Sequence, residues 1–324
     1  MAVHYAIRHL TGFRYVTPVS ESVMELRMRP SNTAQQRCLQ FEVEVQPRAR
    51  VFAYRDYRGN WVHHFDIPRR HGQLAITARA QVQLDDPTPL PDRLPLEAWR
   101  TIDEWDAREE EWEYRQPSRF AEWSPALIGF ADALGTSRRH ELDPLTSARE
   151  TMAAIHRSFE YAPNSTRVDS PIDETLASRR GVCQDFTHIM LATLRWMGVP
   201  CRYVSGYIAP REVTGGSEPT TIATHAWVEA LLPELGWVGL DPTHNLHTGL
   251  RHVRVAVGRD YADVPPTRGT FKGQTSSVLE VSVEVTPADA LPTLDRAVLD
   301  VTFVPEAAAP ADGERERQMQ QQQQ

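Results

Sequence analysis

The chain has 324 residues, of which 41% are hydrophobic and 24% charged, enough for two domains with hydrophobic cores. Its formal net charge of −8 argues against a general nucleic-acid binder, because such proteins carry a basic surface. No apolar stretch suits a signal peptide or a membrane span, and three widely spaced cysteines suit a reducing compartment. We therefore expect a cytoplasmic protein without nucleic-acid or membrane partners.

The N-terminal region carries patterns in which apolar and polar residues alternate. Four segments of this kind predict strands: 5–14, 39–45, 61–67 and 74–84. Together they indicate an antiparallel β-rich domain over residues 1–86. The proline-rich run 86–91 ends the pattern, because proline cannot donate a backbone hydrogen bond. Residues 87–142 then form an irregular or short-helical connector.

A helix is predicted to open the next domain, which we place at 143–256. Asp143 can cap this helix, and Pro144 suits the first helical position, where no backbone N–H is needed. The apolar residues that follow share one helical stripe: Leu145, Ala148, Met152, Ile155 and Phe159. This stripe predicts a buried face.

A second helical pattern starts after Gly181 and contains Cys183. Its apolar positions keep helical spacing as far as Gly198: Phe186, Ile189, Met190, Leu194 and Met197. Cys183 then lies in the first turn, where backbone N–H groups without helical partners favour a thiolate. One of these groups could also donate to the oxyanion that forms when a carbonyl is attacked.

Two downstream strand patterns each carry a residue that can serve this thiol. Residues 224–231 alternate, which places His225 and Trp227 on the same face. Residues 236–241 alternate as well and end at Asp241. As neighbouring antiparallel strands they would bring His225 beside Asp241. Cysteine, histidine and aspartate in this order form a nucleophile, its base and the group that orients the base.

Four motifs around these residues resemble the bacterial branch of the transglutaminase-like superfamily: GVCQDFTH, RYVSGY, HAWVE and GWVGLDPT. They follow the family's order, and further similarity extends the resemblance to most of the chain up to about residue 285. The resemblance implies an α+β fold, with a papain-like core whose cysteine helix packs on an antiparallel sheet, preceded by an antiparallel β module. It also implies Cys183 as nucleophile, His225 as base and Asp241 as the orienting residue.

Other roles are open to several of these residue types. A lone cysteine is most often a buried packing residue, and we assign that role to Cys38 and Cys201. His188 lies five positions after Cys183, about 140° away around a helix, so it is a poor partner for the thiol. It could pair with Asp185 on one helix face instead.

No cofactor is expected. His244, His247 and His252 cluster after Asp241 and offer the alternative of a metal site, but neither His-Glu-x-x-His nor Cys-x-x-Cys occurs. We therefore predict no metal, and no dense acidic loop indicates calcium. The candidate substrate-binding residues are Trp227, Trp237 and Gln184, with burial in the core as the alternative for the two tryptophans.

The C-terminal part contains one further strand pattern, at 278–285, within a segment that we place at 257–306. This strand could complete the N-terminal domain. Residues 307–324, rich in alanine, proline and glutamine, have the composition of a disordered tail.

The chemistry expected from these residues is acyl transfer through a thioester. Cys183 attacks an amide carbonyl of a peptide or protein substrate, and His225 protonates the leaving amine. Water as the acceptor makes the enzyme a cysteine peptidase or amidase, which we favour because the sequence shows no dedicated amine channel. An amine acceptor makes it a transglutaminase. The alternative from another class is an inert peptide-binding or assembly module that uses edge strands of the N-terminal region.

Overall fold

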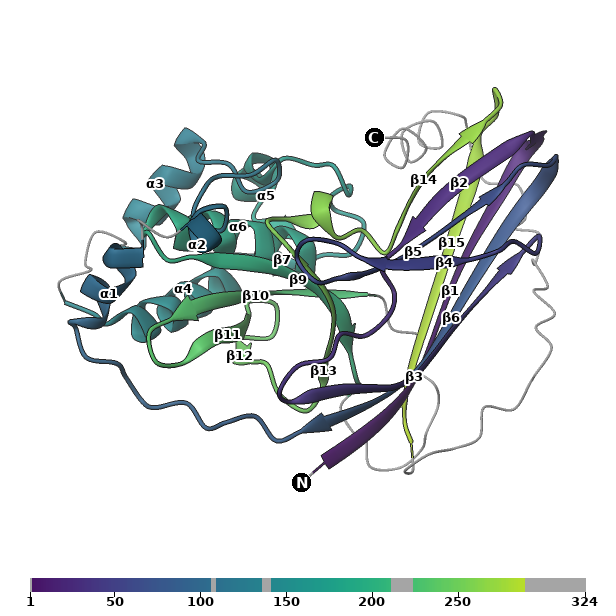
Figure 1. Cartoon of the computed structure of the whole chain (residues 1–324). Helices are drawn as coiled ribbons and strands as arrows, with labels where there is room; N and C mark the ends of the chain where they lie inside the picture. The colour runs from purple at the N-terminus through teal and green to yellow at the C-terminus, as the bar shows by residue number, and fades with distance from the viewer. Residues whose placement is uncertain (1, 106–108, 136–140, 211–223, 289–324) are drawn as a thin grey trace, which may run out of the picture. The chain divides into compact units, whose positions relative to one another are not determined.

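The computed structural model describes residues 2–105, 109–135, 141–210 and 224–288 (Figure 1). The chain forms two compact units, each built from separate stretches of sequence. The first comprises 1–85, 207–224 and 266–324, and the second comprises 86–206 and 225–265. The tail predicted at 307–324 lies outside the described residues, as does the end of the segment 257–306.

The first unit contains two antiparallel four-stranded sheets. One sheet has the order β15 (Ser277–Pro287), β1 (Ala2–Val19), β6 (His71–Asp85) and β3 (Gln36–Gln46). The other has the order β14 (Thr267–Lys272), β2 (Glu21–Leu26), β5 (Trp61–Ile67) and β4 (Phe52–Arg55). Apolar side chains from both sheets form one core, which includes Phe13, Leu26, Phe65 and Ile76.

The four strands predicted in the N-terminal region correspond to β1, β3, β5 and β6. The strand predicted near the C-terminal end is β15, and it pairs with β1 from Tyr5 opposite Pro287 to Tyr15 opposite Ser277. It therefore completes the N-terminal sheet, as the sequence suggested. The strands β2, β4 and β14 were not predicted, because each is short and gives little period to detect.

The second unit joins helices to an antiparallel sheet (Figure 1). Its helices are α1 (Ala98–Glu104), α2 (Glu109–Trp112), α3 (Pro125–Ala133), α4 (Pro144–Ser158), α5 (Ile172–Ser178) and α6 (Cys183–Trp196), with a 3-10 turn at Tyr261–Asp263. The sheet has the order β12 (Leu246–His247), β11 (Gly236–Asp241), β10 (His225–Leu232), β9 (Cys201–Ile208) and β13 (His252–Gly258). A two-residue parallel ladder joins β7 (Glu160–Tyr161) to β8 (Arg180–Gly181). The α+β class is confirmed.

The packing of α6 decides where its cysteine lies. This helix packs against β10, and α4 packs against α6, β10 and β11. The apolar stripe of α6 is buried, as predicted, and the helix ends at Trp196, followed by Met197 as its C-cap and by Gly198 with φ 85°. Helix α4 starts as expected, with the Asp143 carboxylate accepting from the N–H groups of Leu145 and Thr146.

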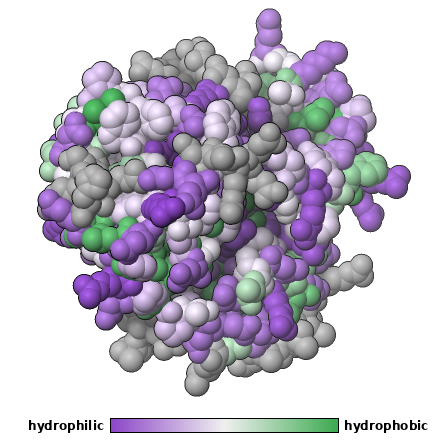
Figure 2. All heavy atoms as spheres, turned by 60° about the vertical axis from the view of Figure 1, so that its left-hand side comes forward, coloured by the Kyte–Doolittle hydropathy of each residue, from purple (hydrophilic) through white to green (hydrophobic). Residues whose placement is uncertain are grey.

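The surface of the molecule is mainly polar on one face, and its described helices do not suit a membrane span. On the face shown in Figure 2, hydrophilic residues dominate and hydrophobic ones form only small, separate patches. Among the described residues, every helix is too short or too polar to cross a membrane.

Candidate active site

Cys183 is the first residue of α6 and is half-buried. The backbone before it is held by Asp185, whose Oδ2 accepts the Val182 N–H at 2.8 Å and the Thr166 hydroxyl at 2.6 Å. Gly181 is required here, because a Cβ at this position would lie 2.9 Å from Asp185 Oδ2 and 3.0 Å from Thr175 Cγ2. Asp185 and Gly181 together fix the turn that presents the sulfur at the helix N-terminus.

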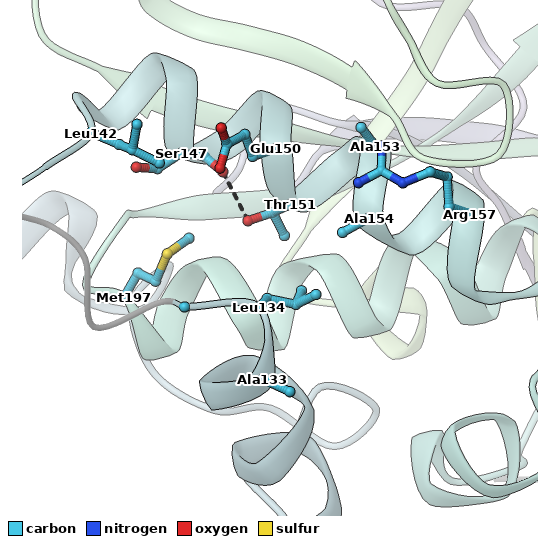
Figure 3. Close-up of a pocket in the computed structure, with 11 residues that line it drawn as sticks. Ala133, Leu134, Leu142, Ser147, Glu150, Thr151, Ala153, Ala154, Arg157 and Met197 are labelled. Carbon is cyan, nitrogen blue, oxygen red and sulfur yellow. Dashed lines mark hydrogen bonds between the residues drawn. The ribbon is translucent and has the colours of Figure 1, made fainter.

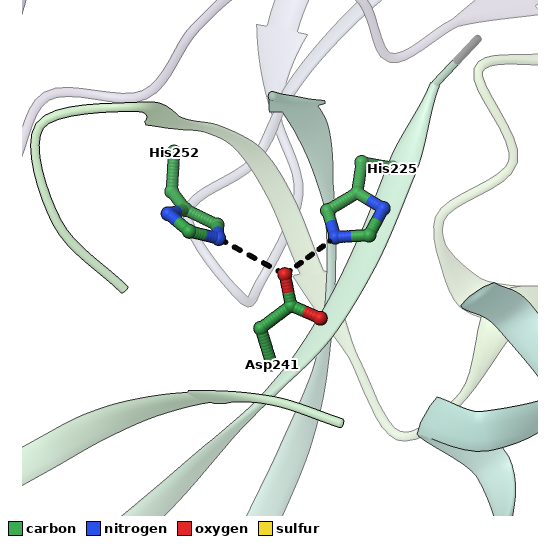
Figure 4. Close-up of side chains that lie close together, drawn as sticks. All are labelled: His225, Asp241 and His252. Atoms are coloured by element: carbon green, nitrogen blue, oxygen red, sulfur yellow. Dashed lines mark hydrogen bonds and ion pairs between the residues drawn. The ribbon is translucent and has the colours of Figure 1, made fainter. Parts of the chain in front are cut away.

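His225 and Asp241 meet because β10 and β11 are antiparallel neighbours. Val228 pairs with Leu240, and continuing this register puts Asp241 opposite Trp227, on the diagonal from His225. His225 Nε2 lies 2.8 Å from Asp241 Oδ2, and both side chains are buried. Figure 4 shows the two rings of His225 and His252 directed at the same carboxylate oxygen.

The electrostatics of the pair favour charge separation. Burial disfavours the charged form of His225, but the hydrogen bond to Asp241 and the interaction with Cys183 outweigh it and raise the pKa of His225 to about 10. Burial also opposes ionisation of Asp241, yet hydrogen bonds from His225, His244 and His252 hold its pKa well below the usual range. Since Nε2 of His225 faces Asp241, its Nδ1 is left for the thiol. The sequence-predicted cysteine, histidine and aspartate are therefore brought together.

Asp241 has more partners than the sequence predicted. Its Oδ2 also accepts from His244 Nδ1 at 2.8 Å and His252 Nε2 at 3.1 Å. Its Oδ1 accepts from the backbone N–H groups of Thr243 and His244 at 2.9 and 3.2 Å. The sequence analysis noticed these histidines only as a possible metal cluster. His247 does not join them, because its Nε2 accepts from Arg149 Nε at 3.0 Å.

Among the described residues, Asp241 and two of the histidines around it are close enough together to hold a metal ion. One ligand atom each from His225, Asp241 and His252 lies within 4.8 Å of the others. However, the nitrogen-to-oxygen distances of 2.8 and 3.1 Å are those of hydrogen bonds, and each of these atoms is already used in one. We assign the cluster to a hydrogen-bond network around a carboxylate.

The three candidate substrate-binding residues have different positions. Trp227 is 1% exposed and packs with Val204 and Val257, so the core alternative applies to it. Trp237 is half-buried between Tyr114, at a ring distance of 5.4 Å, and Arg202, whose guanidinium lies 3.8 Å from the ring centre. It precedes Asp241 by four residues, about 13 Å along the strand.

Gln184 follows Cys183 directly and has a structural partner. Its side-chain amide donates to the Val168 carbonyl at 2.8 Å and so ties the 163–170 loop to the first turn of α6. Val168 itself is 41% exposed. Gln184 therefore acts on the surroundings of Cys183 through the loop.

Tyr161 is a neighbour of Cys183 that the sequence analysis missed. It pairs in register with Gly181 through the parallel β7–β8 ladder and is 51% exposed. Its ring centre lies 6.4 Å from that of Phe186 in α6. Burial, and then the charge on Cys183, raise the pKa of Tyr161. A two-residue strand gives no periodic signal, so only the structure places this side chain at the thiol.

Asp185 and His188, which helix spacing allows to pair, have other partners in the structure. Asp185 turns back to the backbone of Val182, while His188 is buried, stacks on Phe120 at a ring distance of 5.3 Å and accepts the Tyr261 N–H at 3.3 Å. The residues have the right spacing for a pair, but Asp185 sits in the first turn, where unpaired N–H groups compete for its carboxylate.

The other two cysteines lack the surroundings of Cys183. Cys201 is buried in β9, and burial raises the pKa of its thiol to about 11. Cys38 is half-buried in β3, and burial raises its pKa as well. Both thiols are therefore poor nucleophiles at neutral pH.

A cavity of about 460 Å³ lies elsewhere in the second unit, beside α3, α4 and the end of α6. Figure 3 shows its lining, which includes Glu150, Thr151, Arg157 and Met197. The Thr151 hydroxyl donates to the Ser147 carbonyl at 2.9 Å within its own helix. None of Cys183, His225 or Asp241 lines this cavity, so it is not the candidate site.

Comparison with known proteins identifies the two parts of the chain. Residues 5–83 match the bacterial transglutaminase-like N-terminal region, and residues 132–242 match the transglutaminase-like superfamily core. The second match contains Cys183, His225 and Asp241.

Relatives extend this similarity. An uncharacterized protein of Mycobacterium leprae is 31% identical over 281 residues, covering 86% of this chain and 96% of the relative. A protein-glutamine gamma-glutamyltransferase of Pseudomonas aeruginosa is 30% identical over 127 residues, covering 36% of this chain and 19% of that protein.

One solved structure supports the fold. A proposed cysteine protease from Cytophaga hutchinsonii superposes with a TM-score of 0.69 and 20% identity, covering 90% of this chain and 93% of that one. The match includes both the β-rich part and the core. This structure supports the fold, and the sequence matches show that the chain belongs to the bacterial transglutaminase-like superfamily.

Proposed function

We propose that this protein catalyses thiol-dependent acyl transfer on amide bonds of peptides or proteins, with water as the acceptor, as a cysteine peptidase or amidase. The observation that carries the proposal is the His225 imidazole, which bonds Asp241 through Nε2 and interacts with Cys183 at the start of α6. Membership of the transglutaminase-like superfamily supports thiol chemistry at this cysteine.

The proposed reaction has two halves. The Cys183 thiolate attacks the carbonyl carbon, and an N–H group of the first turn of α6 donates to the oxyanion. The carbon–nitrogen bond then breaks while the leaving amine takes a proton from His225, which leaves a thioester and a neutral imidazole. Water attacks the thioester and gives a proton to His225, and the acid product leaves with the thiolate–imidazolium pair restored.

Hydrolysis is favoured by the surroundings of the thiol. A transglutaminase must keep water, at about 55 M, away from the thioester and position an amine instead. The two candidate substrate-binding tryptophans do not supply such walls, because Trp227 is buried in the core and Trp237 lies at the other end of β11 from Asp241. Among the described residues, the exposed aromatic side chain beside Cys183 is that of Tyr161.

Amine transfer is the second candidate, because part of the core resembles the Pseudomonas glutamyltransferase. The test is incubation of the full chain with a glutamine-containing peptide and a labelled primary amine at millimolar concentration, followed by mass spectrometry. We expect acid or cleaved product and little adduct, with Cys183→Ala inactive. Predominant amine adduct would replace hydrolysis by transglutamination. If neither product forms and iodoacetamide labels all three cysteines equally, the inert binding module becomes the better interpretation.

A further inference from the structure

We infer that His244 and His252 are positioning residues of the proposed reaction, which act through Asp241 by sharing its negative charge and so limit how tightly His225 holds its proton. The inference rests on the proposed function, since it assigns a task to residues around the same triad. Neither histidine interacts with Cys183 in the way that His225 does.

The first observation is the crowding of donors at one oxygen. Asp241 Oδ2 accepts from three imidazoles, His225 at 2.8 Å, His244 at 2.8 Å and His252 at 3.1 Å. A carboxylate oxygen offers about two lone pairs, so the three N–H groups compete for it. The other oxygen is held by two backbone N–H groups. The Asp241 side chain is fully buried, so water cannot take part in this competition.

The second observation fixes the form of His252. Its Nδ1 accepts the Gly249 N–H at 3.3 Å, so that nitrogen carries no proton. Its Nε2 must then carry the proton that is donated to Asp241, and the ring is neutral. Burial keeps it neutral, because it lowers the pKa of His252. The ring is fixed further by Trp227, which lies edge-on at 5.3 Å.

Sharing has a chemical consequence for His225. A carboxylate bound to His225 alone would stabilise the imidazolium fully, which helps to form the thiolate but makes the imidazolium a poor acid. Two further donors remove part of that stabilisation. His225 can then keep the thiolate charged and still release its proton to the leaving amine.

Other titratable groups surround His225 and Asp241. His225 interacts with Cys183 of α6, Asp241 of β11, His244 of the turn after β11 and His252 of β13. Tyr161 of β7 and Tyr203 of β9 interact with the Cys183 charge, and burial raises the pKa of both phenols. Both phenols therefore stay neutral at acid and neutral pH.

The test uses paired variants that remove or retain the donated hydrogen bond. His252→Leu removes the donor, whereas His252→Gln places an amide N–H near the position of Nε2. His244→Ala removes the donor at a half-exposed site, and His244→Asn retains an N–H near Nδ1. His247→Ala is the control, because the His247 ring accepts from Arg149 and is not one of the three imidazoles that bond Asp241.

Two measurements on the full chain separate thiolate formation, which should become easier in the donor-removing variants, from turnover, which should become slower. The first is the pH dependence of Cys183 alkylation by iodoacetamide, whose acid midpoint should move down by about 0.5 to 1 pH unit in the donor-removing variants. The second is hydrolysis of the glutamine-containing peptide at saturation, which should fall about tenfold in kcat because the more basic His225 releases its proton less readily. The Gln, Asn and His247→Ala variants should stay within about twofold of wild type in kcat.

The outcomes separate this inference from the proposed function. If Cys183 of the wild type is not labelled selectively, the proposed function fails, and the inference with it. If the wild type is labelled and hydrolyses the peptide, but the donor-removing variants leave the acid midpoint unchanged, the inference alone is overturned. Loss of alkylation and hydrolysis together without a midpoint shift means a structural role and also overturns it. If His252→Leu does not fold, the comparison of His244→Ala with His244→Asn at the half-exposed site tests the inference.

Discussion

Two regions of the molecule each place a nucleophile-type side chain against an imidazole. In the second unit, Cys183 faces His225, which bonds the Asp241 carboxylate. In the first unit, the Ser22 hydroxyl lies 2.9 Å from His71 Nε2, and His71 Nδ1 donates to the Arg69 carbonyl at 2.7 Å.

The difference between the two regions lies in exposure and charge. Ser22 is fully buried, and its imidazole is oriented by a neutral carbonyl. Cys183 is half-buried at a helix N-terminus, and its imidazole is oriented by a carboxylate. The Ser22 hydroxyl, the His71 imidazole and the Arg69 carbonyl are therefore a structural hydrogen-bond network. A reactive arrangement also needs a nucleophile that substrate can reach and a negative charge that stabilises the imidazolium.

The largest expected effect comes from removing each nucleophile-type side chain. Cys183→Ala should lower peptide hydrolysis by about 10⁴-fold or more, because no thioester can form. Ser22→Ala should leave the rate within about twofold of wild type. Initial rates of acid product formation measure both. A loss of similar size in the Ser22 variant would break the comparison.

The second-largest expected effect comes from removing each imidazole, that of His225 or that of His71. His225→Ala removes the cation that stabilises the thiolate and the acid that protonates the amine, so hydrolysis should fall by about 10³- to 10⁴-fold, with slower alkylation of Cys183 at neutral pH. His71→Ala should keep the activity of the folded protein but cost about 1 to 3 kcal/mol of stability, since it leaves the buried Ser22 hydroxyl with only the long 3.4 Å hydrogen bond to the Tyr15 hydroxyl. Rates and urea unfolding curves measure the two effects. An inactive but fully stable His71 variant would contradict this assignment.

The pH dependence of stability should also differ between the units. His225 has a pKa raised from 6.5 to about 10, so its contribution is complete below pH 6.5 and is lost as the pH rises through about 10. Buried His63 in the first unit has a pKa lowered from 6.5 to about 4, mainly by burial and then by Arg29, so it destabilises the fold as the pH falls from 6.5 towards 4.

Urea unfolding from pH 4 to 10 tests these opposite signs. Replacing His225 by Gln should flatten the alkaline limb of the stability curve, and replacing His63 by Gln should flatten the acid limb. If the His225 variant follows the wild-type curve in parallel above pH 6.5, the buried imidazolium is not formed.

The smallest expected effect concerns two glycines of the second unit. Gly181→Ala should destabilise the protein by about 1 to 3 kcal/mol, because the new Cβ meets Asp185 and Thr175 at 2.9 to 3.0 Å. It should also slow Cys183 alkylation, since Asp185 holds the turn before the helix. Gly129→Ala in α3 is the matched control: no atom lies within 4 Å of its Cβ, so it should stabilise by up to about 1 kcal/mol. Melting curves that rank the two variants in the opposite order would refute the steric argument.

Much of the candidate site could be predicted from the sequence. The helix that starts at Cys183 and the strands that carry His225 and Asp241 are visible as local periodicity, and the structure has them within one residue of the predicted positions. The join through residues 232–236 makes the two strands neighbours, so their antiparallel pairing also follows from nearby sequence.

Other parts could not be predicted, for identifiable reasons. Helix spacing allows Asp185 to pair with His188, but the competition from the Val182 N–H appears only once the turn is built. Trp227 was considered for the substrate site because it shares a strand face with His225, yet Val204 and Val257 cover it. Periodicity gives the face of a strand and says nothing of what covers that face.

The sequence alone determined the helix start at Cys183, the strands of His225 and Asp241, and the family to which the chain belongs, because each depends on residues close together in the chain. Tertiary structure decided the rest. It brought His244 and His252 onto Asp241 from a turn and another strand, placed Tyr161 beside Cys183 through a two-residue ladder, and added β14 to an N-terminal sheet. His244 and His252 follow Asp241 by only 3 and 11 residues, but the turn and the strand that aim both rings at one oxygen leave no periodic pattern in the chain. The packing that selects the other contacts leaves no such pattern either.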